Sequence, residues 1–454
     1  MLISFKVSNF LSFQEMTTFS LVGGRVKMFD NRLKQIDDKL KVLSFSAIYG
    51  PNASGKTNFV KAIREFGFRV LKNARKRFFD CSYAGETDSS RKPSYFEATF
   101  SFKENIYIYG FEYIYETNSF ISEWFFKIID GEEVRVFERN IEKGTIEFDG
   151  SIEEKDEKRF SILCEDLAFD GKTLLANYVF NSLNKITSAD LEEIASVYKW
   201  VRIDLEVTLP DEELTTPDYY LEGSKLNELS NLLKRYGTGI KKLDTQLLSE
   251  VEVREALSDD LIQRVKDDLG GEKGSDRVVY LRSDKNLFFV SKNRKGIIEY
   301  SKILFVHEFK GKDSVLTMGD ESDGTIRIMQ LAPILLTRSK NKTFFVDEFD
   351  RCLHPLLSVH FIEEFMELAS SKNNNNQLII TTHESLLMDL ELLRRDEIWF
   401  VEKKDGASDL YSLDAFQERF DKRINKNYLI GRYGSVPVFQ DTMGNICTDE
   451  RKNK

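Results

Sequence analysis

The sequence predicts an α/β protein with a mixed sheet, an antiparallel β-meander and an inserted, mainly helical lobe. A glycine-rich loop lies between an apolar strand and an amphipathic helix near the N-terminus. Aromatic-rich segments separated by short turns follow at 95–148, which is typical of antiparallel strands. Strand and helix patterns then alternate between 326 and 382, as in parallel α/β sheets.

The composition supports a globular protein and excludes several other classes. The chain has 454 residues, 41% of them hydrophobic, and 65 Lys+Arg against 75 Asp+Glu give a net charge of −10, which disfavours a generic nucleic-acid coat. The apolar runs are short and the first residues lack a cationic patch before a long apolar stretch, so we expect no membrane helix, no secretory signal and a cytoplasmic location. Four scattered cysteines without ligand spacing argue against a disulfide framework or a zinc site.

The first predicted elements are a strand at 2–7, a strand at 43–49 and a helix after the glycine-rich turn. The helix is predicted because apolar residues recur at helical spacing: Phe59, Ile63, Phe66 and Val70. Four short aromatic-rich strands follow at 96–102, 106–115, 125–129 and 134–137. These strands predict the antiparallel meander.

The pattern becomes helical between 151 and 276, with candidate helices at 174–183, 191–201, 226–236 and 257–269. Strand patterns resume at 278–309, and then helix 326–336, strand 343–346, helix 359–370 and strand 378–382 alternate. We therefore expect 1–150 and 277–415 to form two sequence halves of one domain. Residues 151–276 are expected to form the inserted helical lobe, and 416–454 a C-terminal extension that packs on the domain.

The glycine-rich loop carries the most specific chemistry in the chain. It fits G-x-x-x-x-G-K-[ST] and consists of Gly50, Pro51, Asn52, Ala53, Ser54, Gly55, Lys56 and Thr57. The glycines let successive backbone N–H groups and the helix N-terminus point at phosphate oxygens. Lys56 is expected to neutralise the β- and γ-phosphates, and the Thr57 hydroxyl to bind Mg²⁺. A simple glycine turn is the alternative, and the flanking strand and helix argue against it.

Polar residues also follow two later apolar strands. Asp347 and Glu348 come after strand 343–346, where Asp347 would hold Mg²⁺, directly or through water, and Glu348 would accept a proton from the attacking water or orient it. His383 ends strand 378–382 and is predicted to donate to the γ-phosphate. A solvated strand end and a structural histidine are the alternatives, which the presence of the phosphate loop disfavours.

A second candidate phosphate-binding surface opens the helix near Ile326. Ser322 and the N–H of Gly324 lie at its positive end, which suits an anion. Ordinary helix capping by Ser322 or Asp323 explains the same residues equally well.

The order of these motifs resembles the head of ABC-type ATPases. The resemblance implies that ATP and Mg²⁺ are bound, and that Ser322 and Gly324 of one subunit cap the γ-phosphate held by another subunit's phosphate loop. It therefore implies a homodimer or a higher homo-oligomer. In detail the sequence resembles AAA/ABC-hybrid ATPases related to SMC-type heads, and this resemblance adds Asn58 to the nucleotide-binding residues. The matching stretches are FKVSNFLSFQ (5–14), YGPNASGKTN (49–58), ESDGTIRIMQLAPIL (321–335), FFVDEFDRCLHP (344–355), TTHES (381–385) and YLIGRYGSVP (428–437).

The same set resembles ATPase subunits of two-gene anti-phage and abortive-infection systems, including the PARIS type, and the ATPase half of overcoming-lysogenisation-defect nucleases. This implies that the ATPase acts as a sensor or regulator of a separate effector protein, which is a nuclease or a toxin. The chain departs from the family pattern because it has no glutamine between Thr57 and Gln246, and because Asp323 and His354 replace a glycine and an aspartate of transporters.

Other functions remain open at this stage. A recombination-mediator-like DNA-repair ATPase shares every nucleotide residue, whereas a transporter motor and a non-hydrolysing scaffold fit less well. Five positive charges at the end of the first helix could meet nucleic acid, although a solvated cluster favoured by the helix dipole is the preferred interpretation: Arg69, Lys72, Arg75, Lys76 and Arg77. We do not expect nuclease activity from this chain alone, because its histidines and remaining acids form no metal-binding pattern.

Overall fold

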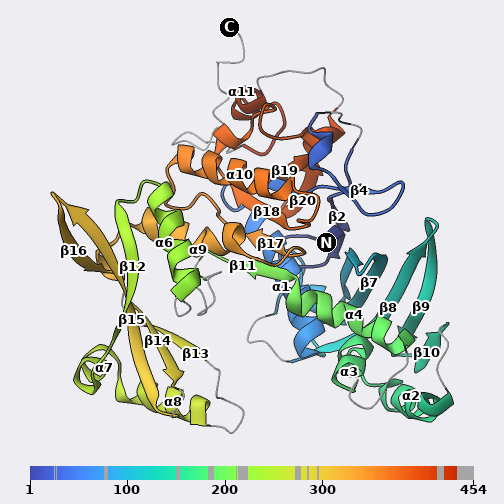
Figure 1. Cartoon of the computed structure of the whole chain (residues 1–454). Coiled ribbons are helices and arrows are strands. Elements are labelled where there is room, and N and C mark those ends of the chain that lie inside the picture. The colour runs from blue at the N-terminus through green and yellow to red at the C-terminus, as the bar shows by residue number, and fades with distance from the viewer. Residues whose placement is uncertain are drawn as a thin grey trace. The chain divides into compact units, whose positions relative to one another are not determined.

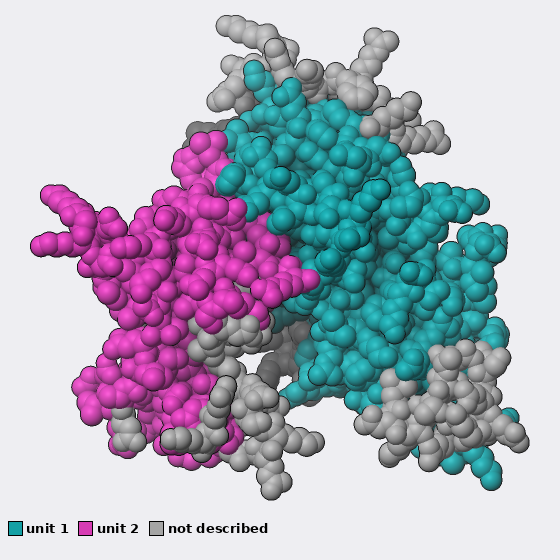
Figure 2. Space-filling model, in the orientation of Figure 1, with its two compact units in different colours: residues 1–210, 339–350, 358–454 teal, residues 211–338, 351–357 magenta. Residues whose placement is uncertain are grey.

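The computed structural model describes residues 1–454 except 25, 27, 76–79, 150–153, 183–188, 211, 213–222, 271–277, 284–285, 294–295, 417–423 and 437–454. The chain forms two compact units, coloured separately in Figure 2. The first unit contains residues 1–210, 339–350 and 358–454, and the second contains 211–338 and 351–357. Each unit is built around its own sheets (Figure 1).

A six-stranded sheet of the first unit carries the polar motifs. Its order is β11-β17-β18-β5-β19-β20, and all neighbours are parallel except β19 and β20. Parallel strands are buried on both faces, which explains why every residue of β5, β17 and β18 is buried. The bounds are β5 Phe45–Tyr49, β11 Leu205–Thr208, β17 Thr343–Val346, β18 Gln377–Thr382, β19 Ile398–Lys404 and β20 Ala407–Ser412, with helices α1 Lys56–Lys72, α10 Pro355–Ala369 and α11 Ile424–Leu429.

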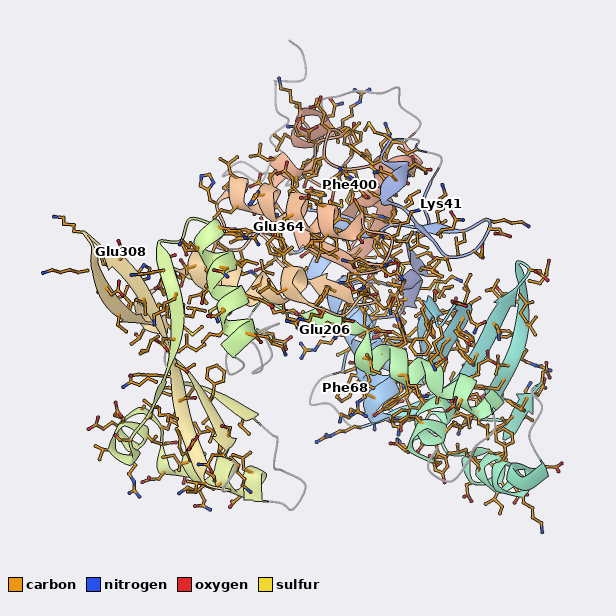
Figure 3. The ribbon with its side chains drawn as sticks, in the orientation of Figure 1. Lys41, Phe68, Glu206, Glu308, Glu364 and Phe400 are labelled. Atoms are coloured by element: carbon orange, nitrogen blue, oxygen red, sulfur yellow. The ribbon has the colours of Figure 1, made fainter. Side chains whose placement is uncertain are left out.

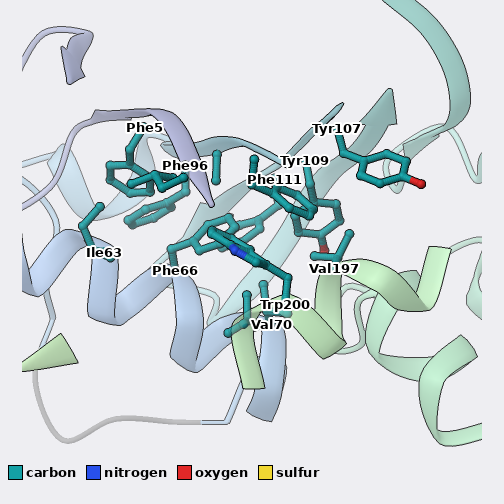
Figure 4. Close-up of a cluster of buried hydrophobic side chains, with 14 of the residues drawn as sticks. Phe5, Ile63, Phe66, Val70, Phe96, Tyr107, Tyr109, Phe111, Val197 and Trp200 are labelled. Atoms are coloured by element: carbon teal, nitrogen blue, oxygen red, sulfur yellow. The ribbon is translucent and has the colours of Figure 1, made fainter. Parts of the chain in front are cut away.

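The predicted meander forms a seven-stranded antiparallel sheet in the order β10-β9-β8-β7-β6-β1-β2. Helix α1 buries the predicted apolar face against it, so that the Phe66 ring stacks on Phe111 with 5.7 Å between ring centroids (Figure 4). The strand bounds are β1 Leu2–Ser8, β2 Thr17–Ser20, β6 Ser94–Phe102, β7 Asn105–Ile114, β8 Ser119–Ile129, β9 Glu132–Asn140 and β10 Thr145–Phe148, and a small pair joins β3 Lys34–Gln35 to β4 Lys41–Val42. The predicted fold class, α/β with a mixed sheet and an antiparallel meander, is confirmed.

The segment expected to form one helical lobe is divided between the two units. Helices α2 (Glu154–Leu167), α3 (Leu175–Ser182) and α4 (Ala189–Ile203) belong to the first unit. The Trp200 ring of α4 stacks on the Phe100 ring of β6 with 4.3 Å between ring centroids. Trp200 is 1% exposed, so this helix is part of the main core (Trp200 is labelled in Figure 4). Helical periodicity predicted these helices but contains no information about which sheet covers their apolar faces.

The second unit is a mixed structure of its own. Its five-stranded antiparallel sheet runs β12-β15-β14-β13, with β16 also paired to β15. The bounds are α6 Gly223–Arg235, β12 Ile240–Leu247, α7 Glu250–Ala256, α8 Asp259–Gly270, β13 Val278–Ser283, β14 Asn286–Lys292, β15 Ile298–Phe309, β16 Lys312–Thr317 and α9 Asp323–Leu336. Within the described part of the chain, no helix combines the length and the apolar character needed to cross a membrane.

Candidate functional site

The sheet of the first unit brings three predicted motifs to one edge. The phosphate loop follows β5, the Asp347–Glu348 pair follows β17, and His383 follows β18. Strand β18 is parallel to both others and lies between them. The carboxyl ends of parallel strands meet at the same edge, so His383 falls between the loop and the acids.

The phosphate loop has a conformation that requires glycine at its end. Gly55 has φ +116°, and a Cβ there would lie 2.3 Å from the Ser408 hydroxyl oxygen and 2.9 Å from that of Ser12. The Ser408 hydroxyl hydrogen-bonds the Ser54 carbonyl at 2.5 Å, and the Asn58 amide donates to the Ser12 hydroxyl at 2.8 Å. Two serines, Ser12 and Ser408, thus hold this end of the loop by hydrogen bonds, a role that the sequence did not indicate.

The Lys56 side chain is hydrogen-bonded within the loop. Its Nζ donates to the carbonyls of Gly50 at 2.7 Å and Pro51 at 3.0 Å. Burial lowers the pKa of Lys56 to about 8, against the opposing attraction of Asp347, Asp350 and Glu348. These carboxylates therefore lie close enough to act on the Lys56 charge.

A threonine that the sequence did not assign fixes the two acids. The fully buried Thr381 hydroxyl donates to Asp347 Oδ1 and accepts from the Glu348 N–H at 2.8 Å. The Asp347 N–H donates to the Thr208 carbonyl of β11 at 3.0 Å. Glu348 has φ +47°, so the chain changes direction directly after β17.

Asp350 joins the site as a further acid. Its carboxylate accepts from the backbone N–H of His383 at 3.3 and 3.4 Å. The pKa of His383 is lowered by burial and by the Lys56 charge, against the attraction of Asp350, Glu348 and Asp347. A lowered pKa favours the neutral imidazole, which can donate one hydrogen bond and accept another.

The residues present fit a nucleoside triphosphate with Mg²⁺. The loop around Gly55 leaves no room for a side chain at that glycine, as a close approach to phosphate requires. The buried Ser54 hydroxyl has no hydrogen-bond partner among the described residues, so it is available to a ligand. Thr57, half-buried at the start of α1, and the buried Asp347 supply oxygen ligands for the ion. Over the described ranges, no three His, Cys, Asp or Glu side chains converge as a complete metal site.

Ser322 and Gly324 lie in the second unit. The Ser322 hydroxyl accepts from the Thr325 N–H at 3.2 Å and caps α9, so the ordinary capping role is present. A Cβ on Gly324 would lie 2.9 Å from the Cys352 carbonyl, so close packing requires glycine here. Directly before the cap, His307 Nε2 hydrogen-bonds Glu321 Oε1 at 2.5 Å. The anion-binding role of this helix start stays a prediction.

The cluster of positive charges at the end of α1 is smaller than the sequence suggested. Arg69 is 1% exposed and pairs with Glu65 at 2.7 Å, so it is part of the core and does not face nucleic acid. Lys76 and Arg77 lie outside the described residues.

The loop, the acids and the histidine at one edge of a parallel sheet define a P-loop nucleotide-binding domain. The chain belongs to the family described as "AAA domain, putative AbiEii toxin, Type IV TA system", which matches residues 45–389. No curated protein sequence matches the chain.

The chain is also similar to solved structures, among them three SMC heads. An SMC head bound to the C-terminal winged-helix domain of ScpA is 13% identical with a TM-score of 0.41, covering 90% of this chain and 97% of that one. The head domain from Thermotoga maritima is 13% identical with a TM-score of 0.37, covering 90% and 98%. The Pyrococcus furiosus head with an extended coiled coil, bound to the C-terminal domain of ScpA, is 15% identical with a TM-score of 0.37, covering 90% and 96%.

Proposed function

We propose that the protein binds ATP with Mg²⁺ and hydrolyses it. The observation that carries the proposal is that the parallel strands β5, β18 and β17 end at one edge of the sheet with the phosphate loop, His383 and the Asp347–Glu348 pair, where the Thr381 hydroxyl hydrogen-bonds both acidic residues. Lys56 neutralises the β- and γ-phosphates, and Thr57 and Asp347 hold Mg²⁺, which when bound offsets phosphate charge. Glu348 orients the attacking water and accepts its proton, and His383 donates to the γ-phosphate.

Two substitutions separate binding from hydrolysis. Lys56→Ala should abolish ATP binding, because the phosphates lose their fixed positive partner. Glu348→Gln should keep ATP bound while hydrolysis falls by about 10²–10⁴-fold, because the base is removed and the shape is kept. The control is Glu367→Gln, an exposed acid on α10. Unchanged turnover in Glu348→Gln would remove Glu348 from this role.

We further propose that two heads enclose ATP, with Ser322 and Gly324 of one subunit meeting the γ-phosphate held by the other. The support is that Ser322 caps the start of α9, that close packing leaves room only for glycine at position 324, and that the motifs occur in this order along the chain. Mixing Lys56→Ala with Ser322→Arg should restore activity, because each mixed dimer rebuilds one composite site. Random pairing restores about a quarter of the sites. A mixture as inactive as its components would favour sites formed within one chain.

The function that we favour is an ATPase that senses phage infection and regulates a separate effector, a nuclease or a toxin. The membership in a family named for an AbiEii-type toxin supports a role in defence. Purified protein with ATP, Mg²⁺ or Mn²⁺ and plasmid or tRNA should show no cleavage until the effector is added. Cleavage by this chain alone, lost in Lys56→Ala, would contradict the two-protein arrangement. Tight, salt-dependent DNA binding would instead favour the DNA-repair alternative.

A further inference from the structure

The stretch YLIGRYGSVP has no role in the proposed chemistry, yet the structure gives its described part a defined shape. After α11, the chain makes a compact turn in which the Arg432 N–H donates to the Asn427 carbonyl at 2.9 Å and the Gly434 N–H to the Gly431 carbonyl at 3.1 Å. Ser435 then adopts the left-handed region with φ +57°. We call residues 427–435, which include the last residues of α11, the tail turn.

Aromatic contacts hold the tail turn on strand β19. The rings of Tyr428 and Tyr433 both stack on Phe400, each with 5.7 Å between centroids (Phe400 is labelled in Figure 3). The Tyr411 hydroxyl of β20 donates to the Tyr433 carbonyl at 2.8 Å. Stacked rings and a backbone hydrogen bond fix both the position and the direction of the turn.

Ser435 connects this turn to the phosphate loop. Its hydroxyl donates to the Val401 carbonyl at 2.5 Å, and the residue is 2% exposed. Strands β5 and β19 pair as far as Tyr49 and Phe400, so Val401 stands beside Gly50 where the pairing ends. Pro51 has no N–H with which to continue the ladder, and Ser435 supplies the donor for Val401.

Gly50 is enclosed by this arrangement. A Cβ there would lie 2.5 Å from the Val401 carbonyl oxygen, 2.6 Å from the Ser54 hydroxyl and 3.3 Å from the Ser435 hydroxyl. Lys56 Nζ in turn donates to the Gly50 carbonyl. The tail turn therefore limits the first residue of the loop, as Ser408 and Ser12 limit its last glycine.

We propose that the tail turn is a positioning element of the phosphate-binding loop and that Ser435 is the residue through which it acts. The proposal rests on the proposed function, because it concerns how tightly the loop holds phosphate. A loop held at both ends before the ligand arrives loses less conformational freedom on binding. The tail turn thus raises affinity for nucleotide without touching it.

The test compares nucleotide affinity with stability in matched variants. Ser435→Gly removes the hydroxyl and tolerates the left-handed backbone, and Tyr411→Phe removes the bond to the tail turn from the other side. Binding of a fluorescent ATP analogue should weaken about 5- to 10-fold in Ser435→Gly and less in Tyr411→Phe. KM should rise while kcat at saturating ATP stays within about twofold. Ser412→Ala, which removes a serine cap at the end of β20, should bind like the wild type.

The outcomes separate the two proposals. If Ser435→Gly melts at a lower temperature but binds the analogue as the wild type does, the serine is merely structural and the tail proposal is wrong. If the wild type binds and Lys56→Ala does not, that result leaves the proposed function standing. If the wild type itself fails to bind ATP, both proposals fall.

Discussion

Replacing Thr381 by valine tests whether its hydroxyl holds the two acidic residues of the site. Valine has nearly the same shape, so the change removes the hydrogen bonds to Asp347 and from the Glu348 N–H without opening a cavity. A hydrogen bond to a charged group contributes about 1.5–3 kcal/mol and one to a backbone N–H about 1 kcal/mol. Thr381 is fully buried, so solvent does not screen these bonds. The free energy of unfolding should fall by about 2.5–4 kcal/mol.

The assay is urea denaturation followed by tryptophan fluorescence. The 3 tryptophans of the chain, Trp124, Trp200 and Trp399, all lie in the first unit, so the signal reports on the unit that contains Thr381. Thr381→Ser is the control, because it keeps the hydroxyl and loses only a methyl group, at a cost of about 1 kcal/mol. ATP hydrolysis should fall in the valine variant and require more Mg²⁺, because Asp347 is no longer held in one orientation.

Equal stability of the valine and serine variants would refute the argument, because loss of the hydroxyl would then cost no more than loss of the methyl group. A destabilised valine variant with unchanged turnover and Mg²⁺ dependence would show that the hydroxyl stabilises the fold but does not position the acids.

Three further predictions follow from buried groups. Burial raises the pKa of Glu397 to about 8, so the folded protein keeps a proton that the unfolded chain releases, and stability falls as the pH rises from about 4.5 to 8; Glu397→Gln should remove that slope in urea midpoints measured at pH 5 and 8. Gly55→Ala should abolish nucleotide binding through its clash with Ser408, whereas Gly131→Ala, with φ +90° but nothing within 4 Å, should not. Arg139→Met leaves the buried Glu123 without its 3.5 Å partner and should cost about 3–5 kcal/mol in urea denaturation, which Glu123→Gln in the same chain should partly recover.

The sequence predicts the parts of the site that are contiguous in the chain. The glycine-rich loop, the acids after β17 and the histidine after β18 each follow an apolar strand, and parallel strands bring their carboxyl ends together. The apolar face of α1 is likewise readable, because Phe59, Ile63 and Phe66 recur at helical spacing. Such features depend on local order and on the general geometry of sheets.

Contacts between distant segments have no comparable signal. The hydroxyls of Ser12 and Ser408 meet at 2.8 Å although 396 residues separate them, and serine is one of the residues most often found at the surface. Thr381 belongs to the TTHES stretch, but only the pairing of β18 with β17 shows that its hydroxyl reaches Asp347. The helices between 154 and 203 are amphipathic, yet nothing in their periodicity selects the sheet that covers them.

These buried hydroxyls determine where the phosphate loop is able to change. Ser435 and Ser408 limit its two ends, while Asn52 and Ala53 between them are exposed. Binding of a phosphate therefore has to be accommodated mainly in the middle of the loop and at the Lys56 ammonium. The ammonium donates hydrogen bonds to the carbonyls of residues 50 and 51. A bound phosphate would replace these carbonyls as the acceptor. Lys56 bonds the carbonyl of Gly50, and Gly50 is also the residue that packs closely against Ser435, so the loop and the tail turn meet at this one glycine.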